Sequence, residues 1–252
     1  MTTIEYLQQP GMPCRKFNRR YRENVLRFLH TAIGMWGGNQ WQGQWASGIR
    51  TERSMMHFCC HFAGRTSHED ICDYSLNSGE KLSATLDSIL GQGCQDVEVI
   101  LKDGGSTDGS VERWKQENAS RPGAERVRII VEEDRGIYDA MNQAVAHAAG
   151  DFLLFLNCGD LLADGSVLER PLAALEEEEQ AGTDMNRLVL YGDTKGEKND
   201  VTIASPPEIT GFACYRNIPC HQSCFYSAAL CRDKPYDLRY RIRADYDHFL
   251  WC

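Results

Sequence analysis

The sequence lacks any long apolar segment. A helix that crosses a bilayer needs roughly 18–20 apolar residues in a row, and no stretch of the 252-residue chain supplies them. The opening residues also lack the basic and then apolar order of a secretory signal. These two absences favour a cytoplasmic protein.

Positive charge is scarce. The chain has 27 basic and 36 acidic residues, which give a formal net charge of −9. Sequence-independent binding of nucleic acid needs a cationic face, so this balance argues against a nucleic-acid partner. Nucleotide binding is still compatible with it, because a metal ion can carry the positive charge that a diphosphate needs.

Because a secretory context is missing, the eleven cysteines are interpreted as reduced thiols rather than as a disulfide framework. Soft metal ligands gather in one window, which holds His57, Cys59, Cys60, His61 and Cys72. That window has no Cys-X₂₋₄-Cys pair of the kind typical of zinc sites, so a zinc module is a minor alternative. The other cysteines, including Cys220 and Cys224, are expected to be small core residues.

The first 72 residues show no convincing hydrophobic period. Residues 23–33 are compatible with one helix, but the Gly-, Gln- and Trp-rich run over residues 34–48 fits neither a helix nor a strand. The sequence of residues 71–77 does not predict a buried strand either. We therefore expect residues 1–72 to be an irregular extension that is not native to the fold that follows.

From Asp73 onward, helices and strands alternate. A capping box at residues 77–80 predicts the start of an amphipathic helix with an apolar stripe of Leu82, Leu86, Ile89 and Leu90. The pattern continues with a strand over 97–101, a helix around Trp114, a strand over 126–131, a helix from Gly136 to a stop at Gly150, and a strand over 152–156. Further strands are expected over 188–191, 201–204 and 223–226. This order predicts an α/β fold with a mostly parallel central sheet flanked by helices.

Two polar loops follow predicted strands directly. Ligands of parallel sheets bind outside the carboxyl ends of the strands, where residues 103–110 and 157–160 are expected to lie. Asp103 begins a Gly-rich loop whose backbone could approach a nucleotide closely. The alternative interpretation of this loop is a plain turn with no ligand. The loop contains no Lys or Arg, which argues against a nucleotidyltransferase that must hold a triphosphate.

Three further polar groups are candidates for chemistry. Asp160, on the second loop, suits a hard divalent cation whose other ligands are diphosphate oxygens and water, although a turn residue is the alternative. Asp245 lies at a predicted helix start, where it is either a cap or a general base. His221 and Gln222 precede a strand and either line a sugar pocket or are polar core residues.

Taken together and in this order, these motifs resemble the family 2 glycosyltransferases with the GT-A fold. The matching blocks are residues 82–90, 97–110, 133–142, 150–160, 220–222 and 244–247. The resemblance covers residues 73–252. The motif Gly-Ile-Tyr-Asp-Ala-Met-Asn at residues 136–142 resembles the corresponding motif of the subgroup that builds bacterial surface and capsular polysaccharides.

The resemblance implies an inverting transfer from a nucleotide-sugar, expected to be a UDP-sugar, to an acceptor hydroxyl in polysaccharide biosynthesis. Asp245 would be the catalytic base, and Asp160 would bind Mg²⁺ or Mn²⁺. The implied donor-binding residues are Asp103 at the uridine, with Gly104, Ser106, Asp134, Gly136, Asn142, His221 and Gln222. The acceptor would be a saccharide or a lipid-linked saccharide. Peripheral attachment to the inner face of the membrane is therefore left open, although no convincing basic amphipathic helix is present.

The sequence also departs from the family pattern. Gly104 and Asn157 replace two aspartates that the family usually carries in these loops. The chain ends within two turns of Asp245, where relatives continue with more helix, so we expect a domain truncated at its C-terminus. A degenerate, non-catalytic nucleotide-sugar-binding protein is the alternative function.

Overall fold

The computed structural model describes residues 2–5, 15–17, 57–59, 69–75, 79–196, 201–216 and 218–252. In the first four of these ranges the description covers the strands and their pairing. The predicted helix over 23–33, the irregular run over 34–48 and the side chains of the zinc alternative lie outside the described residues. Within the described part, no helix combines the length and the apolar character needed to cross a membrane.

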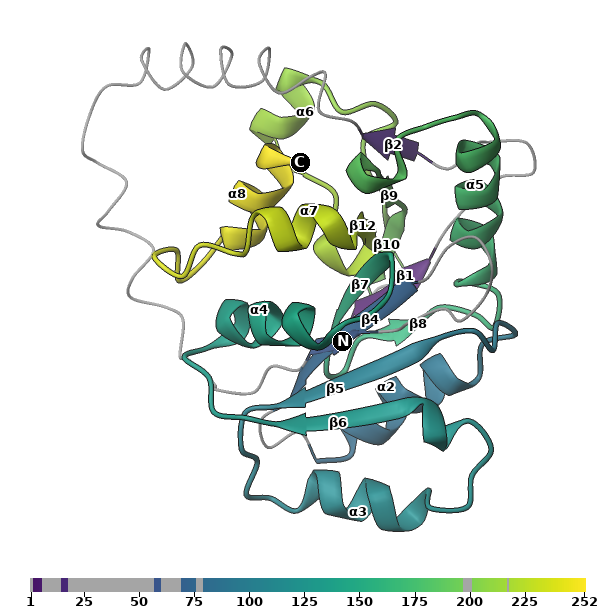
Figure 1. Ribbon diagram of the computed structural model, residues 1–252, viewed down its shortest axis with the longest axis vertical. Coiled ribbons are helices and arrows are strands. Elements are labelled where there is room, and N and C mark those ends of the chain that lie inside the picture. The colour runs from purple at the N-terminus through teal and green to yellow at the C-terminus, as the bar shows by residue number, and fades with distance from the viewer. Residues whose placement is uncertain are drawn as a thin grey trace.

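The described strands form two sheets (Figure 1). The larger has the order β2-β9-β12-β7-β4-β5-β3, with β6 also paired to β5, and the smaller has the order β11-β10-β1-β8. The strands are β1 Thr2–Glu5, β2 Arg15–Phe17, β3 His57–Cys59, β4 Glu69–Ser75, β5 Glu98–Asp103, β6 Val127–Val131, β7 Phe152–Asn157, β8 Leu161–Leu162, β9 Val189–Tyr191, β10 Asp193–Gly196, β11 Val201–Ile203 and β12 Cys224–Ser227. The α-helices are α2 Lys81–Leu90, α3 Ser110–Glu117, α4 Ile137–His147, α5 Glu169–Gln180, α6 Gly211–Arg216, α7 Ala228–Asp233 and α8 Ala244–Trp251.

The centre of the larger sheet is parallel, as predicted. β4 pairs in parallel with both β5 and β7, and β5 pairs in parallel with β6. The prediction that residues 71–77 form no buried strand was wrong, because β4 occupies residues 69–75 and lies between β5 and β7. β1, β2 and β3 likewise pair with strands of the predicted domain: β1 with β8 and β10, β2 with β9, and β3 with β5. That the remainder of residues 1–72 lies outside the native fold stays a prediction.

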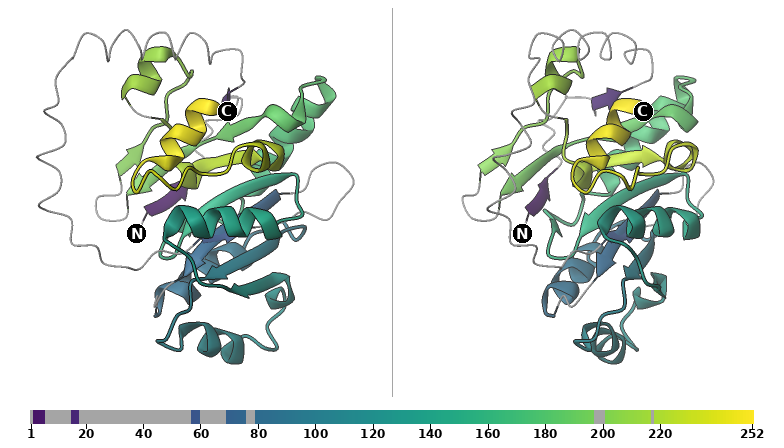
Figure 2. Two further views of the ribbon diagram at one scale, coloured as in Figure 1. Left: turned by 60° about the vertical axis from the view of Figure 1, so that its left-hand side comes forward. Right: turned by 90° about the vertical axis from the view of Figure 1, so that its left-hand side faces the viewer.

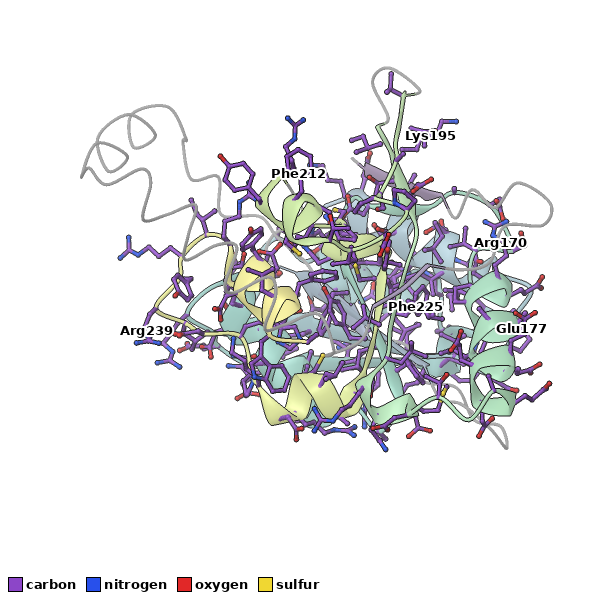
Figure 3. All side chains as sticks on the ribbon, turned by 90° about the horizontal axis from the view of Figure 1, so that it is seen from above. Arg170, Glu177, Lys195, Phe212, Phe225 and Arg239 are labelled. Carbon is purple, nitrogen blue, oxygen red and sulfur yellow. The ribbon has the colours of Figure 1, made fainter. Side chains whose placement is uncertain are left out.

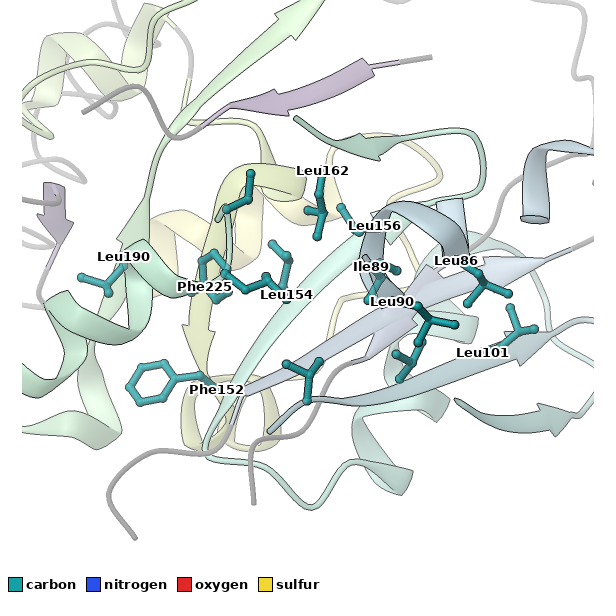
Figure 4. Close-up of a cluster of buried hydrophobic side chains, with 14 of the residues drawn as sticks. Leu86, Ile89, Leu90, Leu101, Phe152, Leu154, Leu156, Leu162, Leu190 and Phe225 are labelled. Atoms are coloured by element: carbon teal, nitrogen blue, oxygen red, sulfur yellow. The ribbon is translucent and has the colours of Figure 1, made fainter. Parts of the chain in front are cut away.

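Side chains alternate between two cores, one on each face of the sheet. In β7, Phe152, Leu154 and Leu156 pack with α2, α3 and α5, while Leu153 and Phe155 pack with α4, α7 and α8. Since successive side chains of a strand point to opposite faces, an unbroken apolar run is what a strand covered on both sides requires. Figure 4 shows the first of these cores, and Figure 2 shows the helices on either side of the sheet.

Two predicted helix ends differ from the structure. α2 begins at Lys81 with Glu80 as its N-cap, and no side chain caps it. The expected capping box is therefore absent at Glu80, and the Gly79 N–H donates instead to the Asp108 carboxylate at 3.0 Å. α4 ends at His147, because the C-cap residue Ala148 has an extended ψ of 138° that stops the helix before Gly150. The apolar stripe of α2 is buried as predicted, and so is Cys224.

A buried histidine makes the second core sensitive to acid. Burial lowers the pKa of His248 to about 4, and its Nδ1 lies 2.9 Å from the Lys234 carbonyl oxygen. As the pH falls, the unfolded chain therefore protonates this imidazole below about pH 6.5, whereas the folded chain protonates it only below about pH 4.

We expect the free energy of unfolding to fall by about 2 kcal/mol between pH 7 and pH 5 on account of His248 alone. His248→Asn keeps an N–H near the Nδ1 position and should remove that slope, as urea titrations at the two pH values would show. An unchanged slope in the variant would contradict this assignment.

Candidate functional site

The carboxyl ends of the parallel strands meet at one edge of the sheet. Ser75 of β4 is in register with Asp103 of β5, and Asp103 is in register with Val131 of β6. Tyr74 of β4 is in register with Asn157 of β7. The two loops that were predicted to bind a ligand therefore leave the same edge, where ligands of open α/β sheets bind.

Asp103 shapes the loop that follows β5. Its side chain is buried, and it accepts hydrogen bonds from the Ser106 backbone N–H at 3.1 Å and from the Ser106 hydroxyl at 2.6 Å. Gly104 lies within this turn, and Gly105 adopts a φ of 94° that a side chain would disfavour. Because a carboxylate has about four acceptor sites, Asp103 can brace the loop and still accept from a ligand.

Asp134 is held by a buried lysine that sequence reasoning missed. The Nζ of Lys102 lies 3.1 Å from Asp134 Oδ2, and the two side chains are 0% and 2% exposed. Nζ also donates to the carbonyl oxygens of Asp103 and Glu132. Lys102 thus ties the end of β5 to the segment after β6. A lysine inside the apolar run of β5 was the available signal.

Gly136 connects this pair to α4. Asp134 Oδ1 accepts from the Gly136 N–H at 3.0 Å. Gly136 has φ 123° and ψ −179°, a region that is essentially restricted to glycine. The start of α4 is therefore fixed from both β5 and β6.

The Asn142 side chain bonds to the backbone between α7 and α8. Its Nδ2 donates to the Tyr236 carbonyl oxygen at 2.9 Å, and its Oδ1 accepts from the Tyr236 N–H at 2.8 Å. The predicted donor-binding side chain therefore braces the segment between α7 and α8. The partner lies 94 residues away in the chain, so sequence reasoning had no means of finding it.

Asp160 lies in the loop after β7 and is 6% exposed. Its Oδ2 accepts from Gln222 Nε2 at 3.0 Å and from the Asn157 N–H at 3.3 Å. The side-chain oxygen of Asn157 is buried and has no hydrogen-bond partner among the described residues. Buried polar atoms normally have partners, so this oxygen beside a carboxylate is able to accept a ligand.

Asp245 is positioned by two side chains at the start of α8. Tyr138 of α4 donates its hydroxyl to Asp245 Oδ1 at 2.8 Å, and His221 Nδ1 lies 3.4 Å from Oδ2. Burial would raise the pKa of Asp245, but the bonds and charge of His221 and the Tyr138 hydroxyl lower it to about 2. Asp245 is therefore ionised at neutral pH, as a proton acceptor must be. Tyr138 was missed as a positioning residue because its partner lies 107 residues away.

A short 3₁₀ turn, η4 His221–Ser223, links the two carboxylates. The consecutive residues His221 and Gln222 reach Asp245 and Asp160 respectively. The structure thus brings Asp160, Asp245, His221 and Gln222 into one connected group, and Asp103, Ser106, Asp134 and Gly136 into a second group along the same edge. No cluster of three or more His, Cys, Asp or Glu side chains suited to a metal occurs in the part of the chain that the structure describes.

The chain is similar to known proteins over most of these elements. The model of the family "Glycosyl transferase family 2" matches residues 74–234. A PGL/p-HBAD biosynthesis glycosyltransferase of Mycobacterium tuberculosis is 38% identical over 71% of this chain, which spans 66% of that relative. An uncharacterized glycosyltransferase of the same species is 31% identical over 70% of this chain and 65% of its own length.

Solved structures agree on the fold. S. aureus TarS in complex with UDP superposes with a TM-score of 0.50 over 69% of this chain and 52% of that chain, at 17% identity. A likeness at that identity shows the shared α/β architecture alone. The family model covers β5, β6, β7, β9 and β12 and both loops at the carboxyl edge. The chain belongs to glycosyl transferase family 2.

Proposed function

We propose that the chain transfers a sugar from a nucleotide-sugar donor, a UDP-sugar, to an acceptor hydroxyl with inversion at the anomeric carbon. The observation that carries this proposal is the pair of carboxylates Asp160 and Asp245, joined through η4 at the carboxyl edge of the parallel sheet. The acceptor we propose is a saccharide or a lipid-linked saccharide, as in surface polysaccharide synthesis.

The donor would lie along the edge from β6 to β7. Asp103 can accept from the N3–H of a uracil while it braces its own loop through Ser106. Gly104 and Gly136 allow the backbone to approach the nucleotide closely. Asp134, held by Lys102, would act by fixing the Gly136 backbone rather than by direct contact.

The residues around Asp160 fit a divalent cation that arrives with the donor. Asp160 offers one carboxylate and Asn157 offers a buried side-chain oxygen without a partner in the described chain. Oxygen ligands of this kind suit Mg²⁺ or Mn²⁺, which keep waters and take diphosphate oxygens as their remaining ligands. When bound, the cation would neutralise the charge that grows on the leaving nucleoside diphosphate.

Asp245 would perform the proton transfer. The acceptor hydroxyl oxygen attacks C1 of the donor sugar, the bond from C1 to the diphosphate breaks, and Asp245 takes the hydroxyl proton. Tyr138 and His221 hold the carboxylate oxygens of Asp245 in place for this step. A single displacement needs no covalent intermediate on the enzyme, so it inverts the anomeric carbon.

Thermal unfolding with UDP and Mn²⁺ tests the donor site. With ligand at about a hundred times its Kd, the folded state should gain about 2.7 kcal/mol, which raises Tm by about 5–10 °C for a chain of this size. UDP alone should give a smaller shift, and Asp160→Ala should abolish the Mn²⁺-dependent part. Asp151→Ala, exposed just before the opposite end of β7, is the matched control and should behave as wild type.

The outcomes separate the two functions. A shift that Asp160→Ala leaves intact would exclude Asp160 as the metal residue. A metal-dependent shift without turnover of any UDP-sugar would favour the degenerate, non-catalytic binder instead.

A further inference from the structure

The connection between α7 and α8 exposes apolar and basic residues in strict alternation. Residues 238–243 read Leu-Arg-Tyr-Arg-Ile-Arg, and all six are exposed. The apolar members Leu238, Tyr240 and Ile242 are 39%, 46% and 67% exposed. Exposed large apolar residues that cluster mark an interaction site. We propose that this strip, residues 238–243, docks the protein on the surface of an anionic phospholipid bilayer.

The charge of the strip identifies the partner. It carries three arginines and no acid, in a chain whose net charge is −9. Arg239 is 86% exposed while it bonds Asp237, and the Arg243 guanidinium lies 5.9 Å from the centre of the Tyr246 ring. Guanidinium groups bind phosphate in two-point contacts, and tyrosine and aliphatic side chains enter the headgroup boundary. An anionic bilayer offers both chemistries on one surface.

The neighbouring helix extends this apolar character. On α6, Phe212 and Tyr215 are 63% and 54% exposed. Tyr246 of α8 donates its hydroxyl to the Cys214 carbonyl oxygen of α6 at 2.5 Å, so α6 packs beside the helix that follows the strip. Figure 3 shows Arg239 at the left of the molecule and Glu177, on the acidic end of α5, at the right. The molecule thus keeps its acidic helix away from a negatively charged surface.

Docking would orient the site. The strip ends two residues before Asp245, so the carboxylate proposed as the base would lie close to the bilayer surface. An amphiphilic acceptor with its hydroxyl group at that surface could then be reached without leaving the membrane. This orientation rests on the proposed function, whereas the docking itself does not.

Sedimentation with lipid vesicles tests the docking. The full chain is mixed with vesicles of phosphatidylcholine alone and with vesicles containing about one-third phosphatidylglycerol, a composition that supplies the anionic surface potential. We expect binding only to the anionic vesicles. Each arginine near such a surface contributes about fivefold to the affinity, so Arg239→Gln with Arg241→Gln should weaken binding about 25-fold. Tyr240→Ser with Ile242→Ser should also weaken it, and that loss should persist at high salt.

Arg113→Gln is the control, because Arg113 is exposed on α3, away from the strip. Circular dichroism of each variant shows whether it is folded, and all of the substituted side chains are exposed. Wild-type affinity in the arginine variant, or failure of the full chain to bind anionic vesicles, would overturn the proposal. The UDP thermal shift is measured on the same samples, so loss of membrane binding is distinguished from loss of the donor site.

Discussion

Asp245→Asn is expected to lower kcat by about 10²–10⁴-fold, the usual contribution of a general base. The amide is nearly the same size as the carboxylate and can still accept from Tyr138 at 2.8 Å, but it cannot take a proton. Donor binding should survive, because Asp245 bonds to Tyr138 and His221 rather than to the residues proposed at the diphosphate. The measurement is nucleoside diphosphate release from the UDP-sugar that gives the largest thermal shift, with an acceptor that supports wild-type turnover.

A control variant and the pH dependence of the wild-type rate sharpen this result. Asp247→Asn, on the same helix, removes a carboxylate that pairs with Lys234 and is 38% exposed, and it should leave kcat within a few-fold of wild type. Because the pKa of Asp245 is about 2, its own titration should not limit the wild-type rate at pH 5 or above. A wild-type rate in Asp245→Asn, with its UDP shift intact, would remove Asp245 from the chemistry.

Lys102→Met should destabilise the fold by about 3–5 kcal/mol, because it leaves a buried carboxylate without its partner. The Asp134 side chain is 2% exposed and bonds to the Lys102 ammonium at 3.1 Å. The three acceptors of that ammonium, on Asp103, Glu132 and Asp134, would all lose a donor. Urea titration of the folded chain measures the effect.

A double variant separates charge from packing. Lys102→Met with Asp134→Asn removes both charges and keeps an acceptor for the Gly136 N–H, so it should recover much of the lost stability. Leu101→Met, at a fully buried neighbour in β5, is the control for a volume-conserving change and should cost less than about 1.5 kcal/mol. A similar small cost for Lys102→Met would show that the ion pair is not important to the fold.

The sequence predicts those parts of the fold that show a hydrophobic period. The apolar runs of β5 and β7 and the helical stripe of α2 are buried as expected, because each is visible within a few consecutive residues. β4 was missed because its sequence, Glu-Asp-Ile-Cys-Asp-Tyr-Ser, has neither an apolar run nor a clean alternation. Its place in the sheet is defined by backbone pairing with β5 and β7, which local pattern does not report.

The site was predictable to a similar extent. Asp103, the last residue of β5, and Asp160, on the loop after β7, lie at the carboxyl edge because strand order places them there. What each side chain contacts depends on residues far away in the chain. Asn142 bonds to Tyr236, and Tyr138 bonds to Asp245. Neither pairing follows from the spacing of residues in the sequence. The sequence could therefore indicate which residues lie in this region, but not which of them would contact a ligand and which only position other side chains.

The turn η4 has an energetic consequence. Because His221 and Gln222 are adjacent in a short turn, a change in the geometry of Asp160 on donor binding would reach Asp245 through one peptide unit. Thermodynamic linkage requires such coupling to be reciprocal. Any factor by which donor binding alters the proton affinity of Asp245 must equal the factor by which ionisation of Asp245 alters donor affinity. The two halves of the site would then share one free-energy cycle, in which loading the donor also prepares the base.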